Sequence, residues 1–319
     1  MKKLIVLVAF VLVAMFALPS VSFAAEVIIG VDYATSDKYN LQIYDAVREE
    51  GAERGWMVFG AEGQREPEGT LANIDSFITR GANYVLTVGV DTNLQAAVQE
   101  KCEAAGVVSV FTAGSRDPGY TIVTDSGSTY EVTKQVAAFL AQQVKEQWNG
   151  QVDLAVVTTN LAMGEVGQDI ITACSEVWSA ELGVSRDDLY IVDCPWDNLR
   201  ASELFTSMLT ANPEARHILA YSFVDLHHGV PLYNAAKAAG RLDQLIMGGQ
   251  NTADDSTPIF MQESPKTWVV QAPLGGDVPG RLFINLIVGA LDGIAIEKKE
   301  YSPTDPSPLS TPDDIADYY

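Results

Sequence analysis

The sequence predicts an α/β protein made of two doubly wound, parallel-sheet lobes with Rossmann-like winding. Short uninterrupted apolar runs alternate with segments of helical periodicity along almost the whole chain, which is typical of parallel strands covered by helices on both faces. Apolar residues make up 47% of the sequence, enough to fill two packed cores. Without a 24-residue leader, 319 − 24 = 295 residues remain, more than one hydrophobic core usually organises. Two domains are therefore expected.

The N-terminus has the pattern of a secretory signal peptide. Lys2 and Lys3 form a basic start, residues 4–18 are almost all apolar, and residues 22–24 form a small-x-small cleavage site. Such a run is too short and wrongly flanked for a membrane-spanning helix. We expect cleavage after residue 24, with residue 25 as the alternative, and export through the inner membrane to the periplasm. No cysteine lies at the cleavage site, so no lipid anchor is expected.

The balance of charge is strongly acidic. The sequence has 20 Lys and Arg residues against 42 Asp and Glu residues, and removal of Lys2 and Lys3 with the leader gives 18 − 42 = −24. Such a surface repels phosphate backbones and anionic lipid head groups. Nucleic acid is therefore not expected as a partner, and the dispersed acidic residues are interpreted as solvated helix faces.

The sequence contains three cysteines, Cys102, Cys174 and Cys194. Their spacings match neither a zinc site nor a Cys-x-x-Cys redox pair. An oxidising compartment permits one disulfide, for which Cys174 and Cys194 are the nearer pair. Three buried free thiols are the alternative.

The first half of the mature chain is interpreted as four strands that alternate with three helices. The predicted strands are residues 27–31, 56–59, 84–88 and 107–111. The predicted helices are residues 39–54, 68–80 and 94–105. Each helix ends beside a glycine, namely Gly55, Gly81 or Gly106, the residue that most easily adopts the left-handed conformation at a helix C-terminus.

The second half repeats this alternation. The predicted helices are residues 132–148, 168–182, 201–210, 229–239 and 278–291. The predicted strands are residues 152–157, 189–193, 217–220, 245–247 and 268–271. From Tyr301 the chain carries four prolines, so we expect an extended C-terminal segment that wraps a lobe or a hinge.

Ligands bind doubly wound sheets at the carboxyl ends of the strands, so two lobes that face each other predict a site in the cleft between them. Five polar residues follow predicted strands and are candidates to bind a small polar ligand: Asp32, Arg116, Gln250, Asn251 and Gln271. Carboxylate and guanidinium groups form charge-assisted hydrogen bonds, and each amide offers both a donor and an acceptor. The alternative for each is an ordinary surface loop.

Several short motifs occur in a characteristic order along the chain. They are residues 71–74 with 78–81, Pro195-Trp196-Asp197, residues 208–213, Met247-Gly248-Gly249-Gln250 and Val270-Gln271-Ala272-Pro273. In this order the sequence resembles the type I periplasmic binding proteins for sugars, the ribose- and glucose/galactose-binding family of ABC transporters. The resemblance covers nearly the whole mature chain.

The resemblance implies that the chain passes between the lobes three times, near residues 126, 271–272 and 300. Residues 25–125 with 273–299 would form lobe one. Residues 126–272 with 300–319 would form lobe two with a C-terminal extension.

The sequence departs from the family at the positions that grip a sugar. Residues 112–116 stand where many members have an Asp-Arg or Asn pair, and residues 222–225 replace an Asn-Asp pair. The arginine expected near Gln168 and Asp169 is missing. A pyranose bound in the usual way is therefore doubtful.

An aromatic ring that stacks on a sugar is provided by Trp196, which occupies the family's stacking position; packing in the core is the alternative. Tyr39 either faces the cleft or packs its own helix. Glu165 and Asp169 fall near the family's polar contacts in lobe two, although carboxylates are favourable at a helix N-terminus in any case. Asp225 either contacts ligand or serves the start of its own helix.

Adjacent His227 and His228 do not indicate a metal site, because neighbouring residues on a helix point about 100° apart and cannot chelate one ion. We expect both on a helix surface. The motifs of serine hydrolases, zinc proteases, phosphate loops and dinucleotide-binding loops are absent from the sequence. No catalytic residue, metal or cofactor is therefore expected.

These features predict a monomeric, non-enzymatic binding protein that captures a monosaccharide or polyol and presents it to an ABC permease in the inner membrane. A sensory module of the same fold that acts on a chemoreceptor or histidine kinase is the alternative. A nucleoside or another oxygen-rich molecule is the alternative ligand.

Overall fold

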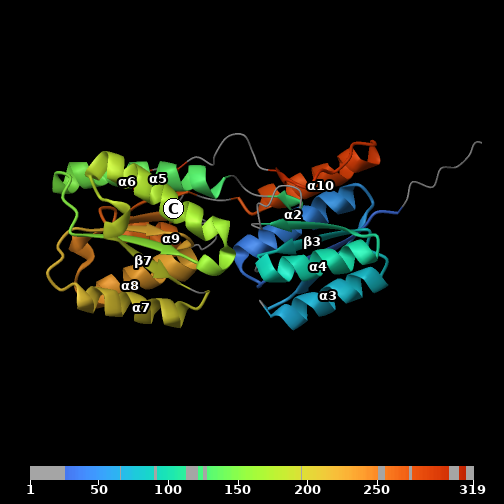
Figure 1. Ribbon diagram of the computed structural model, residues 1–319, viewed down its shortest axis with the longest axis horizontal. Coiled ribbons are helices and arrows are strands. Elements are labelled where there is room, and N and C mark those ends of the chain that lie inside the picture. Colours follow the sequence, from blue (N-terminus) through green and yellow to red (C-terminus); the bar gives the residue numbers. More distant parts are fainter. Residues whose placement is uncertain are drawn as a thin grey trace, which may run out of the picture.

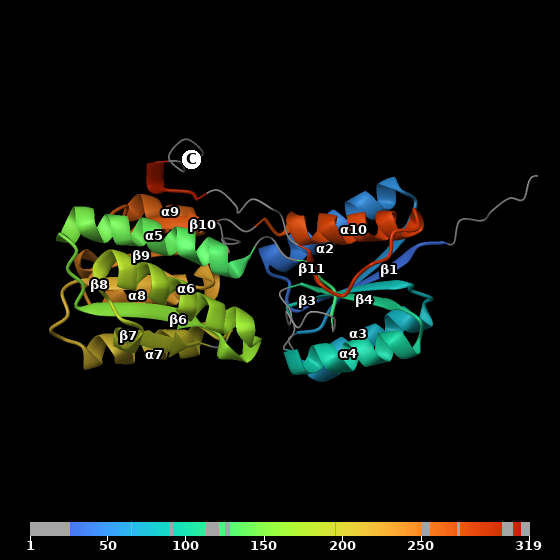
Figure 2. The ribbon, with the colours of Figure 1, turned by 45° about the horizontal axis from the view of Figure 1, so that its top comes forward.

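The computed structural model describes residues 26–64, 66–89, 92–112, 121–124, 128–194, 196–250, 256–272, 275–301 and 309–313. Within these residues the chain forms two α/β lobes that lie side by side along the long axis (Figure 1). Each lobe has one parallel sheet with helices on both faces (Figures 1 and 2). The predicted fold class is confirmed.

The sheet of the first lobe has the strand order β11-β5-β4-β3-β1-β2, with all neighbours parallel. Its strands are β1 (Ile28–Tyr33), β2 (Met57–Glu62), β3 (Tyr84–Val88), β4 (Val108–Thr112), β5 (Val123–Thr124) and β11 (Glu300–Tyr301). One face is covered by α2 (Lys38–Glu53) and α10 (Asp277–Leu291), and the other by α3 (Pro67–Thr79) and α4 (Thr92–Ala104).

The sheet of the second lobe has the order β10-β9-β8-β6-β7, also parallel throughout. Its strands are β6 (Leu154–Thr159), β7 (Leu189–Asp193), β8 (Ile218–Ser222), β9 (Leu245–Gln250) and β10 (Trp268–Ala272). One face carries α5 (Thr129–Trp148) and α6 (Glu165–Leu182). The other carries α7 (Asn198–Ala211), α8 (Val230–Ala238) and α9 (Ser256–Glu263).

Four short turns complete the second lobe. Three are 3-10 helices: η1 (Leu161–Met163), η2 (Arg186–Asp188) and η4 (Leu242–Gln244). The fourth, η3 (Asp225–Gly229), is a π-helical turn that runs directly into α8. The sequence predicts a helix over residues 229–239 with His227 and His228 on a helix surface, and it misses the π turn, because such a turn adds a residue and breaks the helical period.

Helix ends follow the predicted chemistry. Gly55, Gly81 and Gly106 have φ values of 70°, 84° and 72°, which confirms the expected left-handed ends. At the other end of a helix, the Asp197 carboxylate accepts the backbone N–H groups of Leu199 and Arg200, so it caps α7.

The chain passes between the two sheets three times. It leaves the first sheet after Thr124, and it leaves the second after Ala272 to form α10 on the first lobe. The third passage follows Tyr301, and Ser310 then pairs antiparallel with Gln271. The sequence-based boundary at residue 300 is wrong for Glu300 and Tyr301, because β11 pairs with β5 in the first lobe. A two-residue strand carries no periodic signal.

All three cysteines are buried and free. The disulfide between Cys174 and Cys194 is therefore not formed, and the alternative of three buried thiols is correct. Among the helices of the described ranges, none combines the length and apolar character that a membrane span requires.

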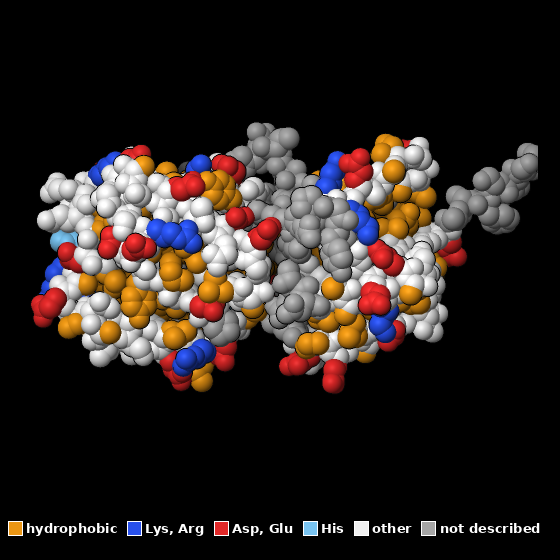
Figure 3. Space-filling view, viewed as in Figure 1, with side chains coloured by type: hydrophobic (Ala, Val, Ile, Leu, Met, Phe, Trp, Pro, Cys, Tyr) orange, Lys and Arg blue, Asp and Glu red, His pale blue; other side chains and the backbone are white. Residues whose placement is uncertain are grey.

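Acidic and basic side chains are scattered over the face of both lobes shown in Figure 3, with neither sign gathered into one large field. Ion pairs such as Lys145–Glu181 and Lys101–Asp75 are exposed. Exposed pairs of this kind contribute little to stability.

Candidate functional site

The carboxyl ends of both sheets lie at the junction of the lobes. Thr124 ends β5 in the first lobe, and α5 begins at Thr129 in the second. Ala272 ends β10, and α10 begins at Asp277 back on the first lobe. Each connection is so short that even a fully extended chain spans only about 18 Å. Because all strands within a sheet are parallel, both carboxyl edges are directed to this junction.

The second lobe contributes an aromatic cluster to the junction, formed by Trp196, Phe223, His227 and His228. Trp196 follows β7 and is partly buried. Its ring centroid lies 5.8 Å from Phe223, 5.6 Å from His227 and 5.8 Å from His228. The interplanar angle with His228 is 14°, so these two rings are stacked.

His228 corrects the prediction of two exposed histidines on a helix surface. The π turn η3 points its ring into the lobe, where the side chain is fully buried. Its Nδ1 lies 3.1 Å from Thr158 Oγ1 on β6. Burial, followed by the charge of His227, lowers the pKa of His228 to about 3, so the ring is neutral at ordinary pH. His227 is partly exposed, with Nδ1 2.8 Å from Asn198 Oδ1.

Two buried amides lie at the carboxyl ends of neighbouring strands of the same sheet. Gln250 is the last residue of β9, and Gln271 lies on β10 beside Gly249. Within the described part of the chain, neither Oε1 nor Nε2 of Gln250 has a hydrogen-bond partner, and Oε1 of Gln271 has none. A buried polar group left unsatisfied costs about 1–3 kcal/mol. These amides are therefore suited to a polar occupant of the junction.

Asp225 is buried at the first position of η3, next to the end of β9. A Cβ atom at Gly249 would lie 2.5 Å from Asp225 Oδ1 and 2.4 Å from the Ser222 carbonyl oxygen. The glycine therefore lets the carboxylate and the backbone of β9 approach closely. Asp225 begins its own helical turn, in line with one of its two interpretations.

Glu165 and Asp169 lie one turn apart at the start of α6. Glu165 is exposed and Asp169 is half-buried. Tyr130, at the start of α5, donates a hydrogen bond to Glu176 of α6, and this bond, followed by desolvation and nearby carboxylates, of which Asp169 contributes least, raises the pKa of Tyr130 to about 12. Because Glu165 is exposed at the first position of α6, it has the exposure expected of a solvated helix N-terminus.

In the first lobe, Asp32 lies on β1 and is fully buried. Its Oδ1 accepts a hydrogen bond from Asn73 Nδ2 at 2.7 Å. Burial raises the pKa of Asp32, and side-chain hydrogen bonds from Asn73 and Thr70 oppose this shift. Both partners belong to α3, so Asp32 fastens this helix to the sheet.

Tyr39 lies in the first turn of α2 and packs its partly buried ring against the core of the first lobe. Its carbonyl oxygen would lie 2.7 Å from a Cβ at Gly276, next to the start of α10. Arg116 and Asn251 lie outside the described residues.

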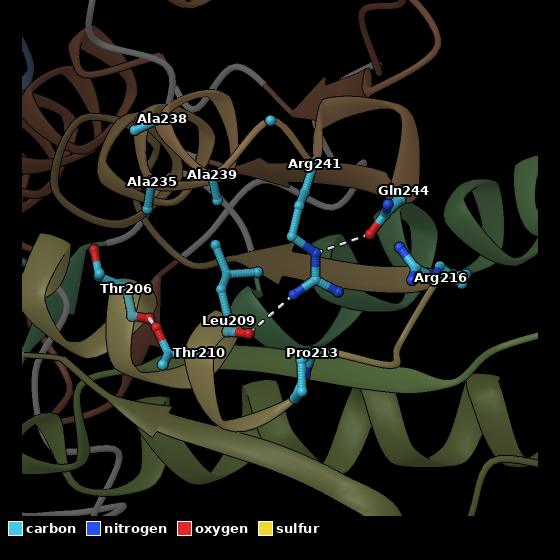
Figure 4. Close-up of a pocket in the computed structure, with 11 residues that line it drawn as sticks. Thr206, Leu209, Thr210, Pro213, Arg216, Ala235, Ala238, Ala239, Arg241 and Gln244 are labelled. Atoms are coloured by element: carbon cyan, nitrogen blue, oxygen red, sulfur yellow. Dashed lines mark hydrogen bonds between the residues drawn. The ribbon is translucent and has the colours of Figure 1, made fainter.

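A second hollow, with a volume of about 520 Å³, lies at the opposite edge of the second sheet (Figure 4). Its central Arg241 donates Nε–H to Gln244 and NH1 hydrogen bonds to the carbonyl oxygens of Leu209 and Asn212. A cation at these carbonyls, at the C-terminus of α7, is favourable. Arg241 therefore has a structural role in this hollow. The junction of the two lobes remains the candidate ligand site.

Comparison with known families supplies the assignment. A model described as a periplasmic binding protein domain matches residues 29–293. This chain belongs to that family. Membership implies a periplasmic location for this binding protein. A comparison with curated protein sequences finds no match.

Solved structures of similar fold include three solute-binding proteins. One is an ABC transporter solute-binding protein from Mycobacterium smegmatis with bound glycerol, at 17% identity and TM-score 0.74, covering 92% of this chain and 96% of the other. The arabinose-transporter component from Shewanella sp. ANA-3, bound to L-arabinofuranose, has 15% identity and TM-score 0.73, covering 91% and 94%. A protein from Bacillus halodurans C-125 with bound myo-inositol has 18% identity and TM-score 0.70, covering 93% and 98%.

In this binding protein the structure gathers Trp196 with Phe223 and the two histidines, and it places Gln250 and Gln271 on adjacent strands. Asp32 belongs to the other lobe and is directed into α3. Sequence analysis missed Thr158 and His228. The available signal was weak, because Thr158 is one polar residue near the end of an apolar strand and the π turn removes the helical periodicity around His228.

Proposed function

We propose that this protein captures a small, neutral, oxygen-rich ligand, a monosaccharide or polyol, between its lobes and presents it to an ABC permease. The single observation that carries the proposal is that the carboxyl edge of one sheet carries both an aromatic surface, at Trp196, and buried amides, at Gln250 and Gln271, with oxygens that have no hydrogen-bond partner within the described residues. A sugar offers a C–H face to an aromatic ring and hydroxyl groups to amides.

The comparisons support this ligand class. The similar structures hold glycerol, myo-inositol and an arabinofuranose. These ligands differ in ring size and in shape, but all carry several neutral hydroxyl groups. We propose that Trp196, Gln250 and Gln271 contact the ligand, with Asp225 and Asp169 beside them and Arg116, Asn251, Asp32, Tyr39 and Glu165 as further candidates.

We also propose that the protein is exported as a monomer, is cut after residue 24, works without a cofactor and catalyses no reaction. Closure of the lobes would remove the ligand from water and create the form that the permease recognises. Mass spectrometry of the exported protein tests the cleavage site. We expect a mature chain that begins at residue 25.

A thermal-shift screen tests the ligand class with glycerol, myo-inositol, L-arabinose, D-ribose, D-galactose and adenosine. A ligand present at one hundred times its Kd stabilises the folded state by about 2.7 kcal/mol, which is a readily measured rise in Tm. A rise with any sugar or polyol supports the proposal. A rise with adenosine alone would change the ligand class, and no rise with any compound would contradict the proposal.

Replacement of Trp196 by Ala tests the stacking surface. We expect the Kd for the compound that binds best in the screen to rise at least about tenfold, because an aromatic contact and its buried area are lost. Trp148→Ala is the matched control, since Trp148 packs against His217 where β8 begins, away from the junction. Calorimetry measures both variants, and equal Kd values for Trp196→Ala and the wild type would remove Trp196 from the site.

A further inference from the structure

His228 forms the layer beneath Trp196. The two rings come from different elements, since Trp196 follows β7 and His228 belongs to η3. They are stacked with centroids 5.8 Å apart. His228 is fully buried, whereas Trp196 is only partly buried. One face of the indole is therefore supported from inside the lobe.

The His228 ring is itself fixed by a hydrogen-bonded chain from the sheet. Thr158 Oγ1 accepts the backbone N–H of Phe223 at 3.0 Å and lies 3.1 Å from His228 Nδ1. Because the hydroxyl oxygen already accepts from Phe223, its own hydrogen can be donated to Nδ1. Phe223 also contacts both Trp196 and His228 through its ring. Thr158 therefore aligns the two side chains that flank the indole.

The π turn is held in place by close packing. A Cβ atom at Gly229, the residue after His228, would lie 2.8 Å from the Trp268 ring and 2.9 Å from Ser222 Oγ. The turn can sit this deep only because residue 229 has no side chain. This packing fixes the backbone of η3, from which the His228 ring projects toward Trp196.

Chemistry at the imidazole does not explain its burial. Burial lowers the pKa of His228 to about 3, so the ring is neutral, and a backbone hydrogen bond at Cys194 opposes this shift without reversing it. The part of the chain described contains no group of three or more His, Cys, Asp and Glu side chains placed to hold a metal ion. What remains is a flat, rigid ring against the indole.

From this geometry we infer that His228 is a positioning residue for ligand binding: it holds the indole plane of Trp196 in the orientation that a ligand stacks on. The inference rests on the proposed function, in which Trp196 is the stacking surface. It adds a buried residue that does not itself contact the ligand but sets the affinity through Trp196.

Fluorine NMR of protein labelled with 5-fluorotryptophan tests the inference without any ligand. The five tryptophans give five resonances, and Trp196→Phe identifies that of Trp196. In His228→Leu, which fills the space but has no flat face, we expect the Trp196 resonance to shift or split while those of Trp56, Trp148 and Trp178 stay in place. His228→Phe restores a flat ring and should restore a single sharp Trp196 resonance. An unmoved Trp196 resonance in His228→Leu would overturn the inference.

Titration with myo-inositol, L-arabinose and glycerol gives the functional arm. In His228→Leu we expect the Kd of the binding compound to rise about five- to tenfold, as for loss of one aromatic pair, and in His228→Phe less than about threefold. A displaced Trp196 resonance with an unchanged Kd would also overturn the inference.

Two further variants distinguish a failure of the inference about His228 from a folding defect and from a failure of the proposed stacking function. If His228→Leu fails to fold, Thr158→Val replaces it, since that variant keeps the ring and removes its hydrogen bond; we expect the same direction of change in the Trp196 resonance and in Kd. If Trp196→Ala binds as tightly as the wild type, the proposed stacking function fails, whereas the fluorine spectra still report whether His228 orients Trp196.

Discussion

Single residues at the junction show how burial changes what a side-chain type means. The sequence predicts that His227 and His228 both lie on a helix surface, yet His228 is a neutral ring in the core. Asp32 has the position of a ligand-binding carboxylate at a strand end, yet it accepts a hydrogen bond from Asn73 within its own lobe. In both cases the partner that decides the role is distant in sequence.

Asp32 gives a prediction for the pH dependence of stability. Burial raises the pKa of Asp32 above the value of 3.8 that it has in the unfolded chain. The folded state therefore binds more protons than the unfolded state between these two pKa values, and this carboxyl group lowers the free energy of unfolding as the pH rises through that window. Asp32→Asn keeps an acceptor for Asn73 and removes the ionisation.

We expect the free energy of unfolding of Asp32→Asn, relative to wild type, to increase as the pH rises from 3.5 to 7. Urea unfolding at several pH values measures it. Asp75→Asn, at a solvent-exposed carboxylate of α3, the helix that carries Asn73, is the control that should lack this trend. A constant difference between Asp32→Asn and wild type would show that the carboxyl group is not desolvated.

At the scale of elements, close backbone contacts decide where helices sit. Helix α10 follows the second lobe in sequence but packs on α2 of the first lobe, with Phe283, Ile284 and Ile287 in that core. Its apolar face indicates a packed helix. Which lobe α10 packs on depends on a close contact between Gly280 and α2. The apolar periodicity of the sequence does not predict this contact.

Gly280 of α10 lies close against the backbone of α2. A Cβ atom there would lie 2.8 Å from the Ile43 carbonyl oxygen and 3.1 Å from Ala46 Cβ. Backbone cannot rotate away, so we expect Gly280→Ala to lower the free energy of unfolding by about 1–3 kcal/mol despite the better helix propensity of Ala.

The matched control is Gly289→Ala on the same helix, where the nearest atom would be 3.7 Å from the new Cβ. This variant should be neutral or up to about 1 kcal/mol more stable. Denaturant unfolding compares the two. Equal stabilities for Gly280→Ala and Gly289→Ala would mean that α10 does not pack on α2 as closely as described.

At the scale of the whole molecule, the two lobes are stable without a disulfide, because all three cysteines are free. Cys102 lies in the core of the first lobe, and Cys174 and Cys194 lie on opposite faces of the second sheet. Burial raises the pKa of Cys102 to about 11 and that of Cys194 to about 12. Because the thiolate is the reactive form, burial protects these thiols in an oxidising compartment.

Thiol titration tests this arrangement. We expect no rapid reaction of native protein with Ellman's reagent, three reactive thiols after unfolding in guanidinium chloride, and the same Tm with and without dithiothreitol. The non-reduced protein should therefore behave as the reduced one does. One reactive thiol after unfolding would instead show that two of the cysteines are paired.

The sequence by itself determined the alternation of buried strands and helices, the glycine-terminated helices and the aromatic position at residue 196. These features depend on local periodicity, turn chemistry and the order of short motifs. All of these can be recognised from residues that are close together in the sequence. The positions of Gln250 and Gln271 near the carboxyl ends of apolar strands were predicted for the same reason.

Only the tertiary structure decided that β11 closes the first sheet, that the thiols are unpaired, that Asp32 serves α3 and that His228 lies beneath Trp196. Each of these depends on contacts between residues far apart in the chain. Such contacts are set by how two surfaces fit once folded, and no local pattern of residues records that fit.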